Sequence, residues 1–236
     1  MKTSTKIILF LAVLSLAAPL TLFIFSYVHQ KELKSGYVWI TKAVPPFSVV
    51  VGMGKTTFSI EGCDSNVVAS HLKNGHVTYL YVRNDTLFVQ ETNIKNEAEE
   101  LIVVRSKSLR SIVVSPGDMI SVSKLKEGPL SLHCTGGFIN IEGNLIDALR
   151  VYDTMKKEPT VTSFLEIVAS NSSEIHLNKM KLKSWSVRLN ESSMEANTII
   201  SDELKLTAKN HSLAKINLCP HKVFAERDSI SDIVLK

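Results

Sequence analysis

Glu174 and Glu195 are the two carboxylates of this chain that come nearest to an arrangement suited to glycoside hydrolysis. That reaction uses two carboxyl groups about 5 to 9.5 Å apart, on either side of the scissile bond. In a chain of stacked repeats, such a pair needs the same offset in neighbouring repeats. These residues follow the equivalent positions Leu165 and Trp185 by nine and ten residues. Because a slip of one residue turns a side chain to the opposite face of a strand, we expect two separate, solvated surface acids.

Other residues capable of chemistry are isolated in the sequence. Cys219-Pro220-His221 is a local Cys/His cluster, but no second pair of ligands accompanies it, as a zinc site would require. We interpret it as a corner set by Pro220. Val51-Gly-Met-Gly54 is too short for a phosphate-binding loop and is predicted to be a bulge or turn. The sequence therefore predicts no catalytic residue, no metal ligand and no cofactor.

The charge distribution argues against a nucleic-acid partner. The formal net charge is +4, and the Lys and Arg residues are scattered rather than gathered into one basic patch with stacking aromatics. Lys179, Lys181 and Lys183 alternate along one stretch, as on the solvated face of a strand.

The second half of the chain repeats a short apolar pattern at nearly constant spacing. Successive repeats open 21, 19, 16, 20, 19 and 19 residues apart. The openings are Leu109, Leu130, Leu149, Leu165, Trp185, Leu204 and Val223. Such a period is typical of stacked supersecondary units.

Each repeat places a small or polar corner between two segments that alternate apolar and polar residues. In one repeat, Leu165-Glu-Ile167 and Ile175-His-Leu177 flank the corner Asn171-Ser-Ser173. Alternation with period two predicts strands with one buried face, and equivalent strands should stack parallel and in register. At one corner, three asparagines are predicted to form a ladder of side-chain amides: Asn171, Asn190 and Asn210.

The series Leu109–Ile112, Leu130–Ile141 and Leu165–Leu177 resembles the "putative auto-transporter adhesin, head GIN domain" family of Bacteroidetes. Phe58–Ile60 and Asn84–Val89 resemble the opening strands of that family, so the likeness covers about residues 47 to 235. The resemblance implies a parallel β-helix in the cell envelope or at the cell surface. It brings no functional residues with it.

The repeat from Leu149 departs from the family pattern, because residues 152–159 interrupt its corner. The expected fold is nevertheless all-β: a single-stranded, right-handed parallel β-helix (β-solenoid) with seven or so turns. Right-handedness follows from the general rule for parallel crossovers.

Before the repeats, five segments rich in β-branched and aromatic residues are predicted to be strands: 47–51, 57–60, 78–83, 86–90 and 101–104. Asn84-Asp85 lies between two of them and predicts a two-residue hairpin turn, because both residue types tolerate positive φ. Residues 93–100 are expected to form a charged loop, or at most one helical turn.

Residues Ile7 to Val28 carry no charge over 22 positions, which is long enough to span a bilayer as a helix. We therefore expect an uncleaved signal anchor over residues 1–29, a tether over 30–46 and one β-helix domain over 47–236. The lipid bilayer would be a partner of the N-terminal helix, with the domain in the periplasm or at the cell surface. A signal peptide cleaved near Ser15-Leu-Ala17 remains the alternative.

Several features leave alternatives open. Asp85-Thr-Leu87, Asp153-Thr-Met155 and Asp228-Ser-Ile230 match a loose pattern for O-glycosylation, yet they also lie at expected turns. Cys134 and Cys219 fall in different repeats and should not be joined to each other. A homodimer through the last repeat stays open, since Ile233-Val-Leu235 would present an uncovered strand edge.

Two functions from different classes follow from this sequence. The first, which we favour, is a non-enzymatic module for binding, adhesion or scaffolding in the envelope, with an envelope protein or a glycan as its partner. The alternative is a carbohydrate-active β-helix enzyme.

Overall fold

The structure, a computed structural model, describes residues 37–73, 79–90, 101–125, 128–143, 162–217 and 221–236. This part of the chain is all-β, as predicted, and contains no helix. A helix long and apolar enough to cross a membrane is accordingly not found among these residues. The predicted anchor over residues 1–29 lies outside them.

The 17 described strands belong to one continuous hydrogen-bonded sheet. They are β1 (Tyr37–Ala43), β2 (Val49–Gly52), β3 (Thr57–Gly62), β4 (Val67–Lys73), β5 (Tyr79–Arg83), β6 (Thr86–Gln90), β7 (Leu101–Ser106), β8 (Ser111–Val114), β9 (Met119–Ser123), β10 (Leu130–Thr135), β11 (Phe138–Glu142), β12 (Thr162–Ser170), β13 (Glu174–Asn190), β14 (Ser193–Lys209), β15 (Leu213–Ile216), β16 (Lys222–Arg227) and β17 (Asp232–Leu235).

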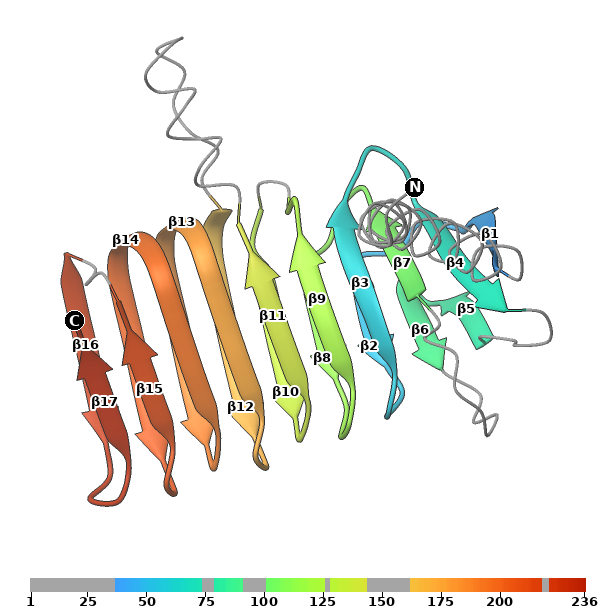
Figure 1. The fold of residues 1–236 in the computed structure, drawn as a ribbon. Helices are drawn as coiled ribbons and strands as arrows, with labels where there is room; N and C mark the ends of the chain where they lie inside the picture. The colour runs from blue at the N-terminus through green and yellow to red at the C-terminus, as the bar shows by residue number, and fades with distance from the viewer. Residues whose placement is uncertain (1–36, 74–78, 91–100, 126–127, 144–161, 218–220) are drawn as a thin grey trace, which may run out of the picture.

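Most strands form two parallel ladders that run along the molecule (Figure 1). The first ladder contains, in spatial order, β6, β2, β8, β10, β12, the second half of β13, the second half of β14, and β16. The second ladder contains β7, β3, β9, β11, the first half of β13, the first half of β14, β15 and β17. We call one strand of each ladder, with the corner that joins them, a rung. The predicted parallel, in-register stacking is confirmed for these strands.

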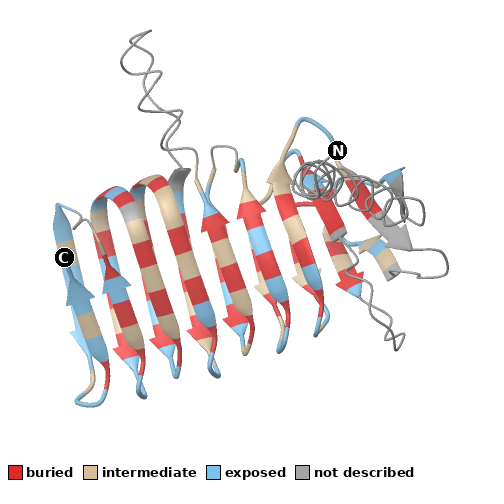
Figure 2. Ribbon diagram, in the orientation of Figure 1, coloured by how far each residue is buried: buried red, intermediate tan, exposed pale blue. Residues whose placement is uncertain are grey.

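Alternation along each strand buries one side of both ladders (Figure 2). In the first ladder the buried column is Val50, Ile112, Leu132, Ile167, Val187 and Leu206, each at most 1% exposed. In the second ladder it is Phe58, Ile120, Ile139, Ile175, Met194 and Ala214. The residues of both columns belong to one buried apolar cluster. Val223, Ile233 and other partly buried residues pack against its edge. The core is therefore a continuous column between the two ladders, as the period-two pattern requires.

The predicted repeat openings lie side by side in the first ladder from the second onward: Leu130, Leu165, Trp185, Leu204 and Val223. Leu109 does not join them. Ser131 pairs with Ser111, which places Arg110 rather than Leu109 beside Leu130. The first repeat therefore opens one residue later than predicted.

The repeat predicted from Leu149 is wrong. Strand β10 pairs directly with β12, with Leu130 opposite Leu165, so no rung lies between them. Residues 144–161 lie outside the described residues. The interrupted pattern at residues 152–159 marks an insertion between two adjacent rungs rather than a rung of its own.

The strands that precede the repeats cover one end of both ladders. Strand β5 pairs antiparallel with β6, and β4 pairs antiparallel with β7. The predicted hairpin turn joins β5 to β6, with φ angles of 49° at Asn84 and 63° at Asp85. Antiparallel pairing of this kind satisfies backbone groups that the end of a stack would otherwise expose.

Strand β1 lies within the range expected as a tether. Residues 37–43 pair antiparallel with β4, from Tyr37 opposite Lys73 to Ala43 opposite Val67. The segment is rich in aromatic and β-branched residues, and the free edge of β4 gives it a full set of backbone partners. Residues 30–36 of the expected tether lie outside the described residues.

A column of buried small or polar residues lines the corner between the ladders. Its members are Thr56, Asp118, Gly137, Ser173, Ser192, Ser212 and Ser231, each immediately before an in-register position of the second ladder. The Ser212 hydroxyl accepts the N–H of Ser192 at 3.3 Å and donates to the carbonyl of Lys209. Ser231 accepts the N–H of Ser212 at 3.1 Å. In these rungs, a buried hydroxyl supplies a partner to the backbone of the preceding rung.

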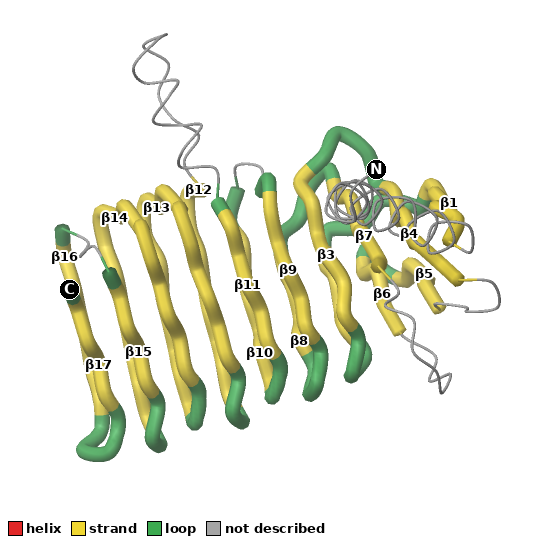
Figure 3. Tube along the Cα trace, in the orientation of Figure 1, coloured by secondary structure: helices red, strands yellow, loops and turns green. Residues whose placement is uncertain are grey.

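Asp118 carries a carboxylate in this column and is fully buried. It accepts the N–H and the hydroxyl of Thr56 at 3.0 and 2.7 Å, and the N–H of Ser115 at 2.7 Å. A Cβ on Gly52 would lie 2.2 Å from its Oδ2 atom, so only glycine fits beside it. Of the residues predicted to form a bulge or turn, Val51 and Gly52 belong to β2. The loop that joins β2 to β3 begins at Met53 (Figure 3), with positive φ at Gly54 and Lys55.

The asparagine ladder is present only in part. The amide of Asn210 donates to Asn190 Oδ1 at 2.5 Å. The backbone register, however, places Asn190 between Ser170 and Lys209, so that Asn171 and Asn210 align with Glu191. The corner continues to Asp228, whose carboxylate accepts the N–H of Asn210 at 2.6 Å. Hydrogen bonds from Ser231 and then from the Asn210 backbone hold the pKa of Asp228 below its usual value.

The stacked core predicts opposite responses at two adjacent positions of β14. Leu206 is 1% exposed, whereas Lys205 points outward. Leu206→Asp should destabilise the full chain by several kcal/mol, because an unpaired charge would enter the core. Lys205→Asp should change stability by no more than about 0.5 kcal/mol. Thermal unfolding measures both, and similar melting of the two variants would contradict the inward orientation of Leu206.

The corner column predicts a smaller but measurable cost. Ser212→Ala removes the acceptor of the Ser192 N–H and leaves that buried group without its partner, which should cost about 1–3 kcal/mol. Ser193→Ala, at a partly exposed position, is the matched control and should be close to neutral. Denaturant unfolding of the two variants would test this. Equal stabilities would show that the serine column only fills space.

Candidate functional site

The two acids singled out in the sequence share one face, contrary to prediction. Glu174 pairs with Ser193 while His176 pairs with Glu195, so both acids point outward from the second ladder, two residues apart in register. The reason lies in the corners. Asn171 and Ser172 both have positive φ in one rung, whereas only Glu191 does in the next, which is one residue shorter.

Each acid is engaged by a neighbour on an open sheet face. Glu174 Oε1 lies 2.7 Å from His176 Nε2. Glu195 accepts the amide of Asn197 at 3.2 Å. Their Cα atoms are about 8 Å apart if strand spacing and rise take their usual values. This separation suits a pair of catalytic carboxylates, but neither residue lines the pocket described below.

The Cys/His cluster is only partly described, because Cys219 and Pro220 lie outside the described residues. His221 is exposed, with Nδ1 at 3.5 Å from the carbonyl of Ser201. Among the residues that the structure describes, no group of three or more metal-ligating side chains is found. Cys134 is a buried free cysteine, and burial raises the pKa of its thiol. Its predicted separation from Cys219 stays a prediction, because Cys219 lies outside the described residues.

The alternating lysines lie where β13 turns from one ladder to the other. Lys179 has a positive φ of 53° and pairs with Glu142 at 3.0 Å. Lys183 is exposed, and Lys181 is half-buried between the buried Met180 and Leu182. The prediction of a solvated face holds for this stretch.

This turn belongs to a third side of the stack, formed by segments that return from the second ladder to the first. In the later rungs the return segments pair as strands, with Met180 opposite Ile199 and Leu182 opposite Ser201. All four residues are buried, so this side is filled.

In the early rungs the third side is incomplete. Strand β3 continues into β4 instead of returning to the first ladder. The return from β7 to β8 takes four residue steps, from Ser106 to Arg110, whereas the returns from Lys124 to Leu130 and from Lys179 to Trp185 take six. A short segment that also has to pass the end of β3 cannot fill this side.

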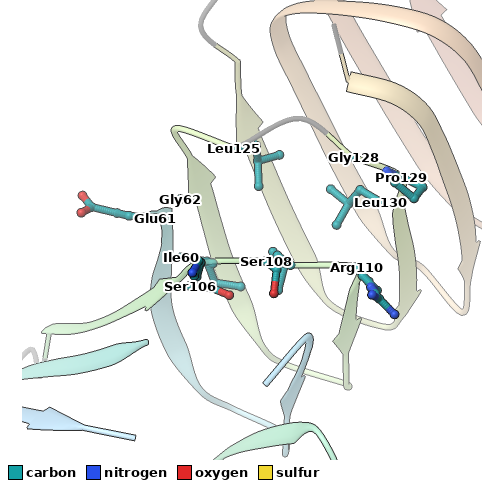
Figure 4. Close-up of a pocket in the computed structure, with 12 residues that line it drawn as sticks. Ile60, Glu61, Gly62, Ser106, Ser108, Arg110, Leu125, Gly128, Pro129 and Leu130 are labelled. Atoms are coloured by element: carbon teal, nitrogen blue, oxygen red, sulfur yellow. The ribbon is translucent and has the colours of Figure 1, made fainter. Parts of the chain in front are cut away.

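A pocket of about 240 Å³ occupies the gap (Figure 4). Its lining includes four aliphatic side chains, namely Ile60, Leu109, Leu125 and Leu130. In Figure 4, Leu125 and Leu130 lie on one side of the opening, and Ser106, Ser108 and Arg110 on the other. Residues 106–110 therefore form a polar wall opposite Leu125 and Leu130, although Leu109 belongs to this segment and Ile60 lies beside Ser106.

The polar wall is fixed through its backbone. The carbonyl of Ser106 accepts the N–H of Cys63 at 2.8 Å, and the N–H of Lys107 donates to Asn66 Oδ1 at 3.0 Å. The N–H of Arg110 donates to the carbonyl of Ser48 at 2.8 Å. These bonds preorganise the segment that carries the polar lining.

Ser106 has an unusual environment in this wall. The residue is 2% exposed, and its hydroxyl has no hydrogen-bond partner among the described residues. A buried hydroxyl without a partner is unfavourable, and such groups in native proteins are uncommon. Because no bond holds it, rotation about the Cα–Cβ bond would present the hydroxyl to the pocket at no cost in hydrogen bonding.

The rim of the pocket is positively charged. Glu61 is the acid of the lining, and it is paired with Arg105 at 3.3 Å and Lys124 at 3.6 Å. Lys107 and Arg110 add two exposed cations to the lining. Among the described residues of this rim, cations outnumber acids, so an anion would be attracted to the opening.

A second surface stands out on the outer face of the first ladder. Tyr81, Phe88, Val51 and Val113 lie side by side across four neighbouring strands. The rings of Tyr81 and Phe88 stack, with centroids 4.8 Å apart and planes 15° apart. The Tyr81 hydroxyl donates to Met53 Sδ at 3.7 Å.

We call these five residues (Met53, Tyr81, Phe88, Val51 and Val113) the aromatic patch. Tyr81 is 44% exposed and Met53 41% exposed. Contiguous exposed apolar side chains on a folded domain typically mark an interaction surface.

Comparison with solved structures shows the fold of this chain in two proteins of Bacteroidetes. One, from Bacteroides fragilis, is described as a "putative adhesin" and has a TM-score of 0.64 at 10% identity, covering 86% of this chain and 98% of that one. The other, from Parabacteroides distasonis and described in the same words, has a TM-score of 0.59 at 11% identity, covering 86% and 97%. At this identity the likeness shows a shared, adhesin-like fold.

Searches by sequence add no relative. No protein-family model matches the chain. No curated protein matches it either.

Both candidate surfaces were missed by the sequence-based interpretation. Leu109 was assigned to open a repeat, whereas it lines the pocket. A signal was available: the return from Ser106 to Arg110 is two residues shorter than that of later rungs. The aromatic patch has no local signal, since its residues become neighbours only through pairing of strands distant in sequence.

The unpartnered hydroxyl predicts that Ser106→Ala will not destabilise the chain. Removing a buried group that lacks a partner should leave stability unchanged or raise it by up to about 1 kcal/mol, a melting shift of a few degrees. Ser201→Ala is the matched control, because the Ser201 hydroxyl is buried and donates to the Glu203 carbonyl at 3.0 Å. That control should lose about 1 kcal/mol. Equal losses in both variants would reveal a hidden hydrogen bond at Ser106.

Proposed function

We propose that this chain is a membrane-anchored, extracytoplasmic module that binds an envelope component and has no catalytic activity. The observation that carries the proposal is the aromatic patch, an apolar surface on the outer face of the first ladder in which Tyr81 and Met53 are exposed. Four of its side chains stand on the paired strands β5, β6, β2 and β8, and Met53 follows β2. Rigid aromatic anchors bind with a small loss of conformational entropy.

The proposed architecture is a right-handed parallel β-helix of the head GIN domain kind. Parallel in-register ladders, a column of corner residues and return segments support it, as does the likeness in fold to the two Bacteroidetes proteins. Handedness follows from the general rule for parallel crossovers.

The proposed setting is the periplasm or the cell surface. Residues 1–29 would anchor the chain in the bilayer, and the tether would hold the domain close to the membrane. The uncharged stretch from Ile7 to Val28 supports this. The partner would be a glycan or a protein of the same envelope, bound at the aromatic patch.

The alternative of a carbohydrate-active enzyme gains one observation from the structure, since Glu174 and Glu195 share an outer face. Binding remains the better supported function. Each acid is engaged by a neighbour, and both lie on an open face of the second ladder rather than in a cleft that could enclose a sugar ring.

Photo-crosslinking in intact cells tests the proposal. The full chain would carry benzoylphenylalanine at Tyr81 or, as control, at Ser121, an exposed outward position of the second ladder. We expect an envelope component to be linked from position 81 and not from 121. Protease and glycosidase treatment of the product would then separate a protein partner from a glycan.

The same cells test the energetic contribution of the patch. With benzoylphenylalanine placed at position 53 instead, Tyr81→Ala should lower the crosslink yield by about tenfold or more, as expected for an aromatic anchor at an interface. Ser121→Ala should leave it unchanged. Crosslinking from position 81 at the level of position 121 would overturn the proposed role of the patch.

A further inference from the structure

We propose that the pocket beside Ser106 is a binding site for a small aliphatic monocarboxylate. The site is distinct from the aromatic patch, because it lies on the return side of the stack and the patch lies on the outer face of the first ladder. The inference does not depend on which envelope component the patch binds.

The size of the pocket limits the ligand. Its volume of about 240 Å³ falls below the range of about 300–1,000 Å³ typical of sites for drug-sized molecules. It corresponds to roughly eight waters at liquid density. A molecule of about eight non-hydrogen atoms, such as a six-carbon carboxylate, would fit this space.

The aliphatic part of the lining selects the body of the ligand. Leu125 and Leu130 lie across the opening from residues 106–110, and Ile60 and Leu109 add aliphatic surface beside that segment. These four side chains offer no hydrogen bonds, so a sugar or another ligand polar on all sides would lose solvation against them. An alkyl chain loses nothing there and gains from leaving water.

The segment of residues 106–110 selects the head group. The buried hydroxyl of Ser106 has no protein partner, and Ser108 adds a second hydroxyl to the lining. Lys107 and Arg110 place two cations on the same segment, while Glu61 is already paired with Arg105 and Lys124. Donors and positive charge on one side favour an anionic head over a neutral or cationic one.

One wall of the pocket is held in place by the protein itself. The backbone of residues 106–110 is held by hydrogen bonds to Cys63, Asn66 and Ser48. Along this wall, binding would require reorientation of side chains only, which lowers the entropic cost.

Hexanoate is the probe that tests this site. The full chain in lipid nanodiscs would be titrated with radiolabelled hexanoate by equilibrium dialysis, and empty nanodiscs would give the partition background. We expect saturable binding with a Kd on the order of 1 mM, an ordinary value for so small a ligand. Acetate, which lacks the body, and 1-hexanol, which lacks the charge, should compete at least about tenfold more weakly.

Variants assign the roles of individual residues. Ser106→Ala should weaken hexanoate binding about tenfold without lowering the melting temperature, which separates loss of a ligand contact from loss of structure. Lys107→Gln and Arg110→Gln should each weaken it up to about fivefold, and added salt should reduce these differences. Lys215→Gln, a cation on the outer face of the second ladder, is the control and should have no effect.

Two outcomes would overturn the proposal. Binding to the chain that does not exceed the empty-nanodisc background would mean that the pocket is a water-filled gap. Saturable binding that 1-hexanol matches, and that none of the three pocket variants changes, would place the ligand elsewhere. Because the aromatic patch is untouched in all these variants, neither outcome bears on the crosslinking test.

Discussion

Every rung of this protein has to turn the chain through a sharp corner inside the stack without leaving buried backbone groups unpaired. The corner column satisfies this constraint by placing a hydroxyl, a carboxylate or a glycine just before each strand of the second ladder. Ser212 shows how it works: one hydroxyl accepts an N–H from the preceding rung and donates to a carbonyl of its own corner. If these bonds were not made, desolvation of the corner would oppose the stacking of the apolar core.

The same constraint explains why corner chemistry varies while the core does not. Where the neighbouring corner is tight, as at Gly137, a Cβ would lie 2.5 Å from Val114 Cγ1 and 2.8 Å from the Ser115 carbonyl oxygen, so glycine replaces serine. Where the neighbour offers two donors and the residue's own corner offers a third, Asp118 takes the position. The apolar columns need only alternation and approximate volume, which many aliphatic residues supply.

This difference decides what could be predicted from the sequence. Alternation is visible locally, and it correctly predicted the parallel stacking, the buried column through Ile167 and Leu206, and the hairpin at Asn84-Asp85. Register between rungs is not local. One corner has two residues at positive φ and the next has one, so the second strands of these two rungs start one residue apart when counted from Leu165 and Trp185. Counting alone therefore placed Glu174 and Glu195 on opposite faces when they share one.

Insertions and changes of direction were the other source of error. The stretch after residue 143 resembled a repeat in length, yet the pairing of β10 with β12 leaves no place for a rung. Strand β1 forms because β4 has a free edge, and no pattern within residues 37–43 indicates that such an edge is available. The aromatic patch could not be predicted, because its strands are distant in sequence. The pocket arises where β3 leaves the stack, and the short return from Ser106 to Arg110 is the signal that the sequence carries for it.

A regular stack offers few positions for a specific site, because each residue has to pair with the rungs on both sides. In the later rungs the return side is filled by Met180, Leu182 and Ile199, and the outer faces carry mostly polar residues. Irregularity frees positions from these demands. The chain departs from its repeat between β3 and β8, where the antiparallel strands β4 and β5 are built before β6 and β7 rejoin the ladders. That departure brings Tyr81 beside Phe88 on one face and opens the gap beside Ser106 on another. The interruption of the repeat is therefore what creates both surfaces that can recognise a ligand.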